Sequence, residues 1–142
     1  MTGRETFVDT NILVYAYDSE AGPKHHAARD ILIDLWNMDG GLLSHQVLQE
    51  FFVTATRKIP KPLPLPLARE IVEDLLTWRV VGLDGQDLLG AIDIQEHEGL
   101  SFWDALIVRA AQKAGAVELL SEDFAAGRAF GNLKVRNPFN SI

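Results

Sequence analysis

Short apolar runs alternate with longer amphipathic segments along the whole chain. In the segment 24–38, for example, Ala27, Ile31 and Leu35 recur at helical spacing and fall on one face. The apolar runs predict strands at residues 6–8, 42–44, 79–83, 117–120 and 134–136. The amphipathic segments predict helices at residues 12–17, 24–38, 45–58, 67–77, 85–98 and 101–114. This alternation is typical of a parallel or mostly parallel sheet with helices on both faces.

Local signals refine several of these boundaries. Thr10 and Asn11 are predicted to cap the first helix, because their side chains can accept hydrogen bonds from backbone N–H groups. Residues 60–66 contain four prolines at alternate positions, which predicts a stiff, extended connector and excludes a helix there. The three tryptophans, Trp36, Trp78 and Trp103, stand among apolar neighbours and are predicted to lie in the core.

Composition indicates a single globular domain spanning residues 1–142. A length of 142 residues and a hydrophobic fraction of 47% suffice for one buried core. No run of eighteen apolar residues is present, and the polar N-terminus shows no signal peptide, so we expect no membrane association. The chain has no cysteine, which excludes disulfides and thiolate-bound zinc. We therefore expect a cytoplasmic protein.

Four acidic residues stand at or near the points where an apolar strand passes into a helix or loop. They are Asp9, Glu50, Asp104 and Asp123, and they are far apart in the sequence. A parallel sheet would bring them to one edge, where their charges repel unless a cation lies between them. Ligands that are all oxygen favour Mg²⁺ or Mn²⁺, and phosphodiester cleavage is the usual chemistry of such a site.

Each of these residues also has a purely structural interpretation. Asp9 and Asp123 both follow strands and could serve only as turn or capping residues. Asp104 follows Ser101 by three positions, as in a capping box, although helical spacing also places it toward the packed side of its helix. Glu50 shares a polar helix face and could simply be solvated.

Two further polar residues could support such a site. Asn11 could hold a carboxylate or a bound water, and Ser121 could offer its hydroxyl to a water or a phosphate. Glu122 is adjacent to Asp123 and is predicted to be exposed and to point elsewhere.

Basic residues gather in two small groups despite a net charge of −7. One group, at the end of a predicted helix, is Arg57, Lys58 and Lys61; the other, Arg109 and Lys113, lies one turn apart on another helix. They could contact RNA phosphates, or they could merely complement helix C-terminal charge. The acidic balance argues against a general nucleic-acid binder, but a small basic surface could still hold a phosphate backbone.

Three stretches of the chain resemble PIN-domain nucleases. They are the opening Phe-Val-Asp-Thr-Asn-Ile-Leu-Val-Tyr at 7–15, Leu-Ser-Phe-Trp-Asp-Ala-Leu-Ile at 100–107, and Leu-Ser-Glu-Asp-Phe at 120–124. The resemblance is closest to VapC-type toxins of bacterial toxin–antitoxin pairs and covers nearly the whole chain. It implies a PIN-like three-layer α/β/α sandwich with a mostly parallel central sheet.

The resemblance also implies an activity and its partners. Asp9, Asp104 and Asp123 would hold Mg²⁺ or Mn²⁺ directly or through water, and Glu50 would orient a water or help to bind the ion. The expected activity is that of a metal-dependent endoribonuclease with a metal-activated water. The expected partners are an RNA substrate, a second copy of the chain in a homodimer, and a cognate VapB-like antitoxin that covers the acidic cleft.

Three other functions fit the sequence less well. A haloacid-dehalogenase-like phosphatase would need a second aspartate two positions after Asp9, where Asn11 stands. A phospho-accepting receiver domain would need an acidic pair near the first strand, and Asp9 has Val8 and Thr10 beside it. A PIN-like domain that binds RNA or a protein without cleavage remains the alternative that the intact carboxylates disfavour.

Overall fold

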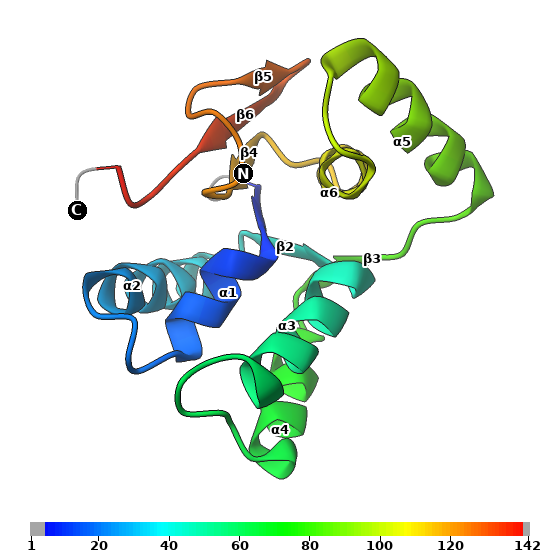
Figure 1. Cartoon of the computed structure of the whole chain (residues 1–142). Coiled ribbons are helices and arrows are strands. Elements are labelled where there is room, and N and C mark those ends of the chain that lie inside the picture. Colours follow the sequence, from blue (N-terminus) through cyan, green and yellow to red (C-terminus); the bar gives the residue numbers. More distant parts are fainter. Residues whose placement is uncertain (1–4, 141–142) are drawn as a thin grey trace.

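The computed structural model describes residues 5–140 (Figure 1). The strands are β1 (Thr6–Val8), β2 (Gly41–Ser44), β3 (Arg79–Val81), β4 (Glu118–Leu120), β5 (Ala129–Phe130) and β6 (Leu133–Arg136). The helices are α1 (Thr10–Tyr17), α2 (Pro23–Met38), α3 (His45–Arg57), α4 (Leu65–Leu75), α5 (Gly85–Glu98) and α6 (Phe102–Lys113). None of these helices is both long and apolar enough to span a lipid bilayer.

The strands form one sheet in the order β3-β2-β1-β4-β6-β5. All neighbouring pairs are parallel except β5 and β6, which form an antiparallel hairpin. The chain steps from β1 to β2 to β3 in one direction and then returns past them to β4. Because such crossovers are right-handed, α1–α4 and α5–α6 cover opposite faces, as Figure 1 shows. The predicted mostly parallel α/β sandwich is confirmed.

The centre of the sheet is fully buried. Phe7 and Val8 of β1 and Leu119 and Leu120 of β4 are all shielded from solvent, which a strand covered by helices on both faces requires. Burial of these short apolar strands fixes the two central strands side by side. Their carboxyl ends therefore open at one shared edge of the sheet.

The prediction that the tryptophans lie in the core is wrong for two of them. Trp103 is 65% exposed and contacts Phe102 in the first turn of α6. Trp36 is 43% exposed and packs its ring edge-on against the half-buried Trp78, with ring centroids 5.3 Å apart. Apolar neighbours in sequence do not decide burial in a helix, because adjacent residues point in different directions.

Two predicted boundaries also differ from the structure. Asp9, not Thr10 or Asn11, is the N-cap of α1, since its side chain accepts the Thr10 N–H. The helix α4 begins at Leu65, inside the proline segment that was predicted to exclude a helix. Pro66 is tolerated there because the first turn of a helix needs no intrahelical N–H donor. The two-residue strand β5 is too short to give a periodic signal and was not predicted.

Candidate active site

The carboxyl ends of β1 and β4 form the place where the strand order reverses. The connection from β1 leads to β2 on one side, whereas β4 lies on the other side of β1. In open α/β sheets, ligands bind at this kind of crevice. Asp9 directly follows β1 and Ser121 directly follows β4, and the Asp9 N–H donates to the Leu120 carbonyl over 3.0 Å. The strand order therefore brings the sequence motif at 7–15 next to the motif at 120–124.

Asp9 is a nearly buried carboxylate, with 4% of its surface exposed. One oxygen accepts a 2.7 Å hydrogen bond from the Thr10 N–H, and the other accepts a 2.7 Å bond from Ser121 Oγ. Burial raises the pKa of Asp9 to about 7 in spite of these two bonds, and the charges of Asp123 and Glu50 add to the rise. A nearby cation would favour the ionised form of Asp9 and so lower this pKa.

Ser121 aligns two of the acidic residues. Its hydroxyl donates to Asp9 and accepts a 3.0 Å hydrogen bond from the Asp123 N–H, and the residue is fully buried. The sequence suggested that this hydroxyl could bind a phosphate. In the structure this hydroxyl is buried, and its two hydrogen bonds join Asp9 to the Asp123 N–H.

Asn11 holds Asp123. Its Nδ2 donates a 2.9 Å hydrogen bond to Asp123 Oδ2, as the sequence suggested. Its Oδ1 is buried and has no hydrogen-bond partner within the described residues. Burial, followed by the charge of Asp104, raises the pKa of Asp123 above its usual range. The amide thus stabilises one carboxylate while its own oxygen stays available to a water or a cation.

Glu50 reaches the same place from α3. It is an exposed residue, and its Oε1 accepts a 3.0 Å hydrogen bond from Thr10 Oγ1. Thr10 also supplies the N–H that binds Asp9, so one residue connects the two carboxylates. Sequence analysis predicted only a capping role for Thr10 and missed its contact with Glu50.

Asp104 lies in the first turn of α6. Its N–H donates to Ser101 Oγ over 3.1 Å, so Ser101 is the helix cap. The Asp104 carboxylate makes no hydrogen bond or ion pair with any described residue, and the reciprocal half of a capping box is missing. Asp104 is half-buried and close enough to Asp123 to raise the pKa of that carboxyl. Capping therefore explains Ser101 and leaves the Asp104 carboxylate unexplained.

A cleft of about 580 Å³ opens beside these residues. Residues of α1 and α3, Lys58 at the C-cap of α3, and Asp123 line it. The lining residues are Thr10, Asn11, Val14, Tyr15, Gln49, Glu50, Val53, Thr54, Lys58 and Asp123.

The family model of the PIN domain matches residues 6–129. The chain belongs to the PIN domain family. This match includes the four acidic residues and the whole cleft. No curated protein sequence matches the chain significantly.

Solved structures share the fold of this PIN domain at low sequence identity. A toxin–antitoxin complex from Klebsiella pneumoniae aligns with a TM-score of 0.69 and 19% identity, over 94% of this chain and 98% of that chain. VapC20 of Mycobacterium tuberculosis, described as a toxin that cleaves the sarcin–ricin loop, aligns with a TM-score of 0.59 and 19% identity, over 80% and 86%. VapBC2 of Rickettsia felis, bound to a promoter DNA fragment, aligns with a TM-score of 0.63 and 17% identity, over 93% and 97%.

The donor set of this PIN domain fits a hydrated divalent cation. Within residues 5–140, no three His, Asp or Glu side chains lie close enough together to enclose an ion. Mg²⁺ keeps several of its waters and takes only one or two carboxylates directly, so it does not need a closed cage. Burial, with a smaller contribution from neighbouring carboxylates, raises the pKa values of Asp9 and Asp123, and Asn11 Oδ1 has no hydrogen-bond partner among the described residues. A bound cation would favour the ionised carboxylates and could bind this oxygen.

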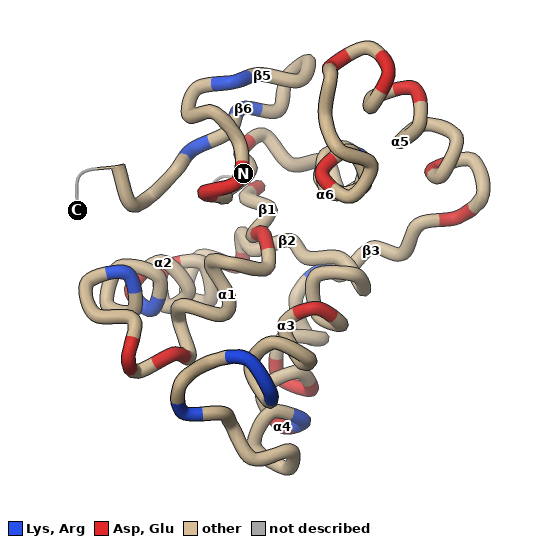
Figure 2. Tube along the Cα trace, in the orientation of Figure 1, with Lys and Arg blue, Asp and Glu red and all other residues tan. Residues whose placement is uncertain are grey.

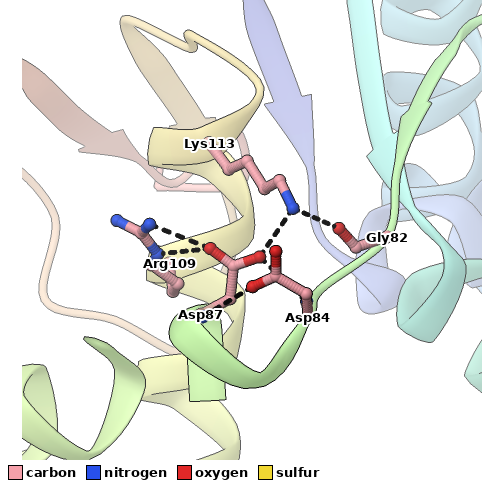
Figure 3. A network of polar contacts seen from close by, with 5 residues as sticks. All are labelled: Gly82, Asp84, Asp87, Arg109 and Lys113. Atoms are coloured by element: carbon pink, nitrogen blue, oxygen red, sulfur yellow. Dashed lines mark hydrogen bonds and ion pairs between the residues drawn. The ribbon is translucent and has the colours of Figure 1, made fainter. Parts of the chain in front are cut away.

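The basic residues divide into two kinds. Arg57 and Lys58 are exposed at the end of α3, and Lys58 lines the cleft. Arg109 and Lys113 instead bind Asp87, over 2.8 Å and 2.6 Å, and Lys113 also donates to the Gly82 carbonyl (Figure 3). These contacts hold the pKa of Asp87 below its usual range, with Lys113 as the largest cause. Arg109 and Lys113 therefore join α6 to α5 and to the loop before it.

Sequence reasoning missed a second polar contact beside the cleft. Glu122 is half-buried, not exposed, and accepts hydrogen bonds from Tyr15 over 2.5 Å and from Lys24 over 2.9 Å. The Lys24 ammonium also lies 5.0 Å from the centre of the Tyr15 ring. The prediction that Glu122 is exposed is wrong, because its burial comes from contacts with α1 and α2 that no local pattern reveals.

Proposed function

We propose that this PIN domain is a metal-dependent endoribonuclease and the toxin of a toxin–antitoxin pair. One observation carries the proposal. Glu50 and Asp123 line one cleft. Asp9 is linked to Glu50 through Thr10 and to Asp123 through Ser121, and the charge of Asp104 acts on Asp123. Burial is the largest cause of the raised pKa values of Asp9 and Asp123, and neighbouring carboxylates add to the rise. Such clusters of oxygen ligands serve metal-assisted phosphodiester hydrolysis.

The acidic residues have two roles in this proposal: binding the ion and orienting the attacking water. Asp9, Asp104 and Asp123 would hold Mg²⁺ or Mn²⁺, some of them through water. A bound ion would lower the pKa of the attacking water and neutralise charge that develops on the scissile phosphate.

Hydrogen bonds within the chain set the charge and the orientation of these residues. The hydrogen bonds from Thr10 and Ser121 favour the ionised form of Asp9, and Asn11 fixes the orientation of Asp123. Glu50, exposed in the cleft, would orient the attacking water.

The partners are inferred from the proteins that share the fold. Some of those structures are toxin–antitoxin complexes, and two contain DNA. We infer a VapB-like antitoxin that covers the acidic cleft, and a homodimer of this chain. The toxin role makes a direct prediction: induced expression should arrest bacterial growth, an Asp104→Asn chain should not, and co-expression of the cognate antitoxin should restore growth.

The test of the enzyme is cleavage of total bacterial RNA by the purified protein with Mg²⁺ or Mn²⁺. We expect discrete fragments that disappear in EDTA and fall by about 100-fold or more in Asp104→Asn, the size of loss typical of removing transition-state charge stabilisation. Asp93→Asn is the matched control, because Asp93 is an exposed carboxylate on α5 outside the site. Cleavage that survives EDTA, or that is equal in both variants, would contradict the proposal.

A further inference from the structure

The residue before Asp123 is held by contacts that the acidic site itself does not use. Glu122 lies in the loop after β4, and both oxygens of its carboxylate accept a hydrogen bond. Oε1 accepts from Tyr15 Oη over 2.5 Å, and Oε2 accepts from Lys24 Nζ over 2.9 Å. A carboxylate bound at both oxygens keeps one orientation, so these contacts restrain the loop that carries Asp123.

One face of α1 holds this loop at two adjacent residues. Asn11 and Tyr15 are four positions apart, so they occupy consecutive turns on the same side of the helix. Asn11 Nδ2 donates to the Asp123 carboxylate, and the Tyr15 hydroxyl donates to Glu122. Because neighbouring loop residues are bound from consecutive turns of one helix, the direction of the loop along α1 is fixed as well as its distance from the helix.

The Tyr15 ring is itself held in place. It packs edge-on against the buried Phe139, with ring centroids 5.3 Å apart and an angle of 89° between the rings. The Lys24 ammonium lies 5.0 Å from the centre of the Tyr15 ring and 5.4 Å from that of Phe139. Figure 2 shows basic residues near the beginning of α2, on the side of the molecule toward which the chain runs after β6. Four segments of the chain thus meet at Glu122 and Tyr15.

We propose that Tyr15 and Lys24 are positioning residues for Asp123. Asp123 is exposed, and within residues 5–140 its carboxylate accepts a hydrogen bond from Asn11 alone. By binding Glu122, Tyr15 and Lys24 hold the loop so that this carboxylate has one orientation before an ion binds, which lowers the entropic cost of binding. The role rests on the metal-dependent ribonuclease proposed above and adds the residues outside the acidic set that control its metal affinity.

The test is a double-mutant cycle between Tyr15 and Glu122, measured as Mn²⁺ affinity by calorimetric titration of the full chain. Tyr15→Phe removes the hydroxyl and keeps the ring, and Glu122→Ala removes its acceptor. Tyr17→Phe is the matched control: Tyr17 lies on the same helix and packs against Phe51, and its hydroxyl has no hydrogen-bond partner among the described residues. The Tm of each chain is measured without metal.

We expect Tyr15→Phe to weaken Mn²⁺ binding by about 10-fold, the lower end of the effect of losing a supporting contact at a metal site. Tyr17→Phe should bind Mn²⁺ as the parent does. In the Glu122→Ala chain, Tyr15→Phe should have no further effect, because Tyr15 acts only through Glu122.

The second contact to Glu122 is tested by rescue. Lys24→Gln should also weaken Mn²⁺ binding, and Lys24→Arg, which keeps a cationic donor, should restore most of the affinity. RNA cleavage by Tyr15→Phe should need more Mn²⁺ to reach half its maximal rate, whereas the rate at saturating Mn²⁺ should stay close to that of the parent. Loss of folded protein would instead lower the maximal rate.

Three results would overturn the positioning role. They are an unchanged Mn²⁺ affinity in Tyr15→Phe, an equal loss in Tyr17→Phe, or an equal effect of Tyr15→Phe with and without Glu122. A lower Tm with unchanged affinity would assign these contacts to stability alone. The parent chain separates the two proposals: if it binds Mn²⁺ and cleaves RNA while the variants keep its affinity, only the positioning role fails, and if it neither binds Mn²⁺ nor cleaves RNA, the ribonuclease fails as well.

Discussion

Ser121 Oγ donates a 2.7 Å hydrogen bond to Asp9 Oδ2, although 112 positions separate the two residues. The bond crosses from the end of β4 to the end of β1, and both residues are buried. It is one of the contacts that lower the pKa of Asp9 against the effect of burial. Ser121 is therefore a positioning residue for the acidic site.

Replacing Ser121 by alanine should move the activity to higher pH. The substitution removes a donor from Asp9 and an acceptor from the Asp123 N–H, so the pKa of Asp9 rises further. The acidic limb of the pH profile of RNA cleavage should shift upward, and stability should fall by about 1–3 kcal/mol, the cost of an unsatisfied buried polar group. Ser19→Ala, at an exposed serine, is the control. An unmoved acidic limb would remove Ser121 from the site.

The ionisation of Asp9 should make folding depend on pH. Its pKa is about 7 in the folded chain and near 3.8 when unfolded, so the folded state binds more protons between these values. Stability contributed by the protonated group is therefore lost as pH rises from about 4 to 7. Asp9→Asn cannot ionise and should be more stable than the parent above pH 7, by about 1 kcal/mol or more, which is about 2–4 °C in Tm.

The measurement is the difference in Tm between the parent and Asp9→Asn from pH 4 to pH 8. It should be near zero at pH 4 and grow toward pH 8. Added Mg²⁺ should raise the Tm of the parent more at pH 8 than at pH 5, because ions bind the deprotonated ligand. A difference that stays constant with pH would show that Asp9 ionises normally.

Asn11→Ala should weaken metal binding without unfolding the chain. Asp123 would lose the amide that orients it, and the loss of such a supporting contact typically costs about 10–100-fold in metal affinity or activity. Calorimetric titration with Mn²⁺ measures the affinity directly. Asn132→Ala, at an exposed asparagine in the β5–β6 turn, should bind the ion as the parent does. Equal affinities in all three proteins would mean that Asp123 needs no orientation by Asn11.

Gly41→Ala should destabilise the sheet far from the acidic residues. A Cβ added at Gly41 of β2 would overlap the ring of Trp78, and overpacking of this kind costs about 1–3 kcal/mol. Gly85→Ala is the matched control, since a Cβ there meets no atom within 4 Å. Urea unfolding compares the two, and Trp78→Leu should rescue Gly41→Ala by making room. A Gly41→Ala chain as stable as Gly85→Ala would contradict this packing.

Lys113→Gln separates structural from RNA-binding lysines. Lys113 binds the buried Asp87 and the Gly82 carbonyl, so its replacement should lower Tm by several degrees while leaving the dependence of RNA binding on salt concentration unchanged (Figure 3). Lys58→Gln should reduce the dependence of RNA binding on salt concentration and leave Tm unchanged. If Lys113→Gln reduces the salt dependence of RNA binding and leaves Tm unchanged, Lys113 contacts RNA, as the sequence suggested, and is not a structural residue.

The sequence by itself determined the kinds of element and the acidic residues. The helix α5 begins and ends where its pattern predicted, because capping at Asp84 and the left-handed Gly99 are local signals. Asp9 and Asp123 could be picked out because a polar residue after a short apolar strand is visible within a few positions. The N-cap of α1 and the start of α4 were misplaced by one or two residues for the same reason: a boundary depends on single hydrogen bonds.

Only the tertiary structure decided which residues meet. Periodicity reports on neighbours within a few residues, whereas the contacts from Ser121 to Asp9 and from Asn11 to Asp123 each span 112 positions. The strand order places β4 beside β1, and that arrangement buries Asp9 deeply enough to raise its pKa. The same level of structure assigned Lys113 to Asp87 and left Lys58 open to the cleft, a distinction that two lysines of equal charge cannot show in sequence.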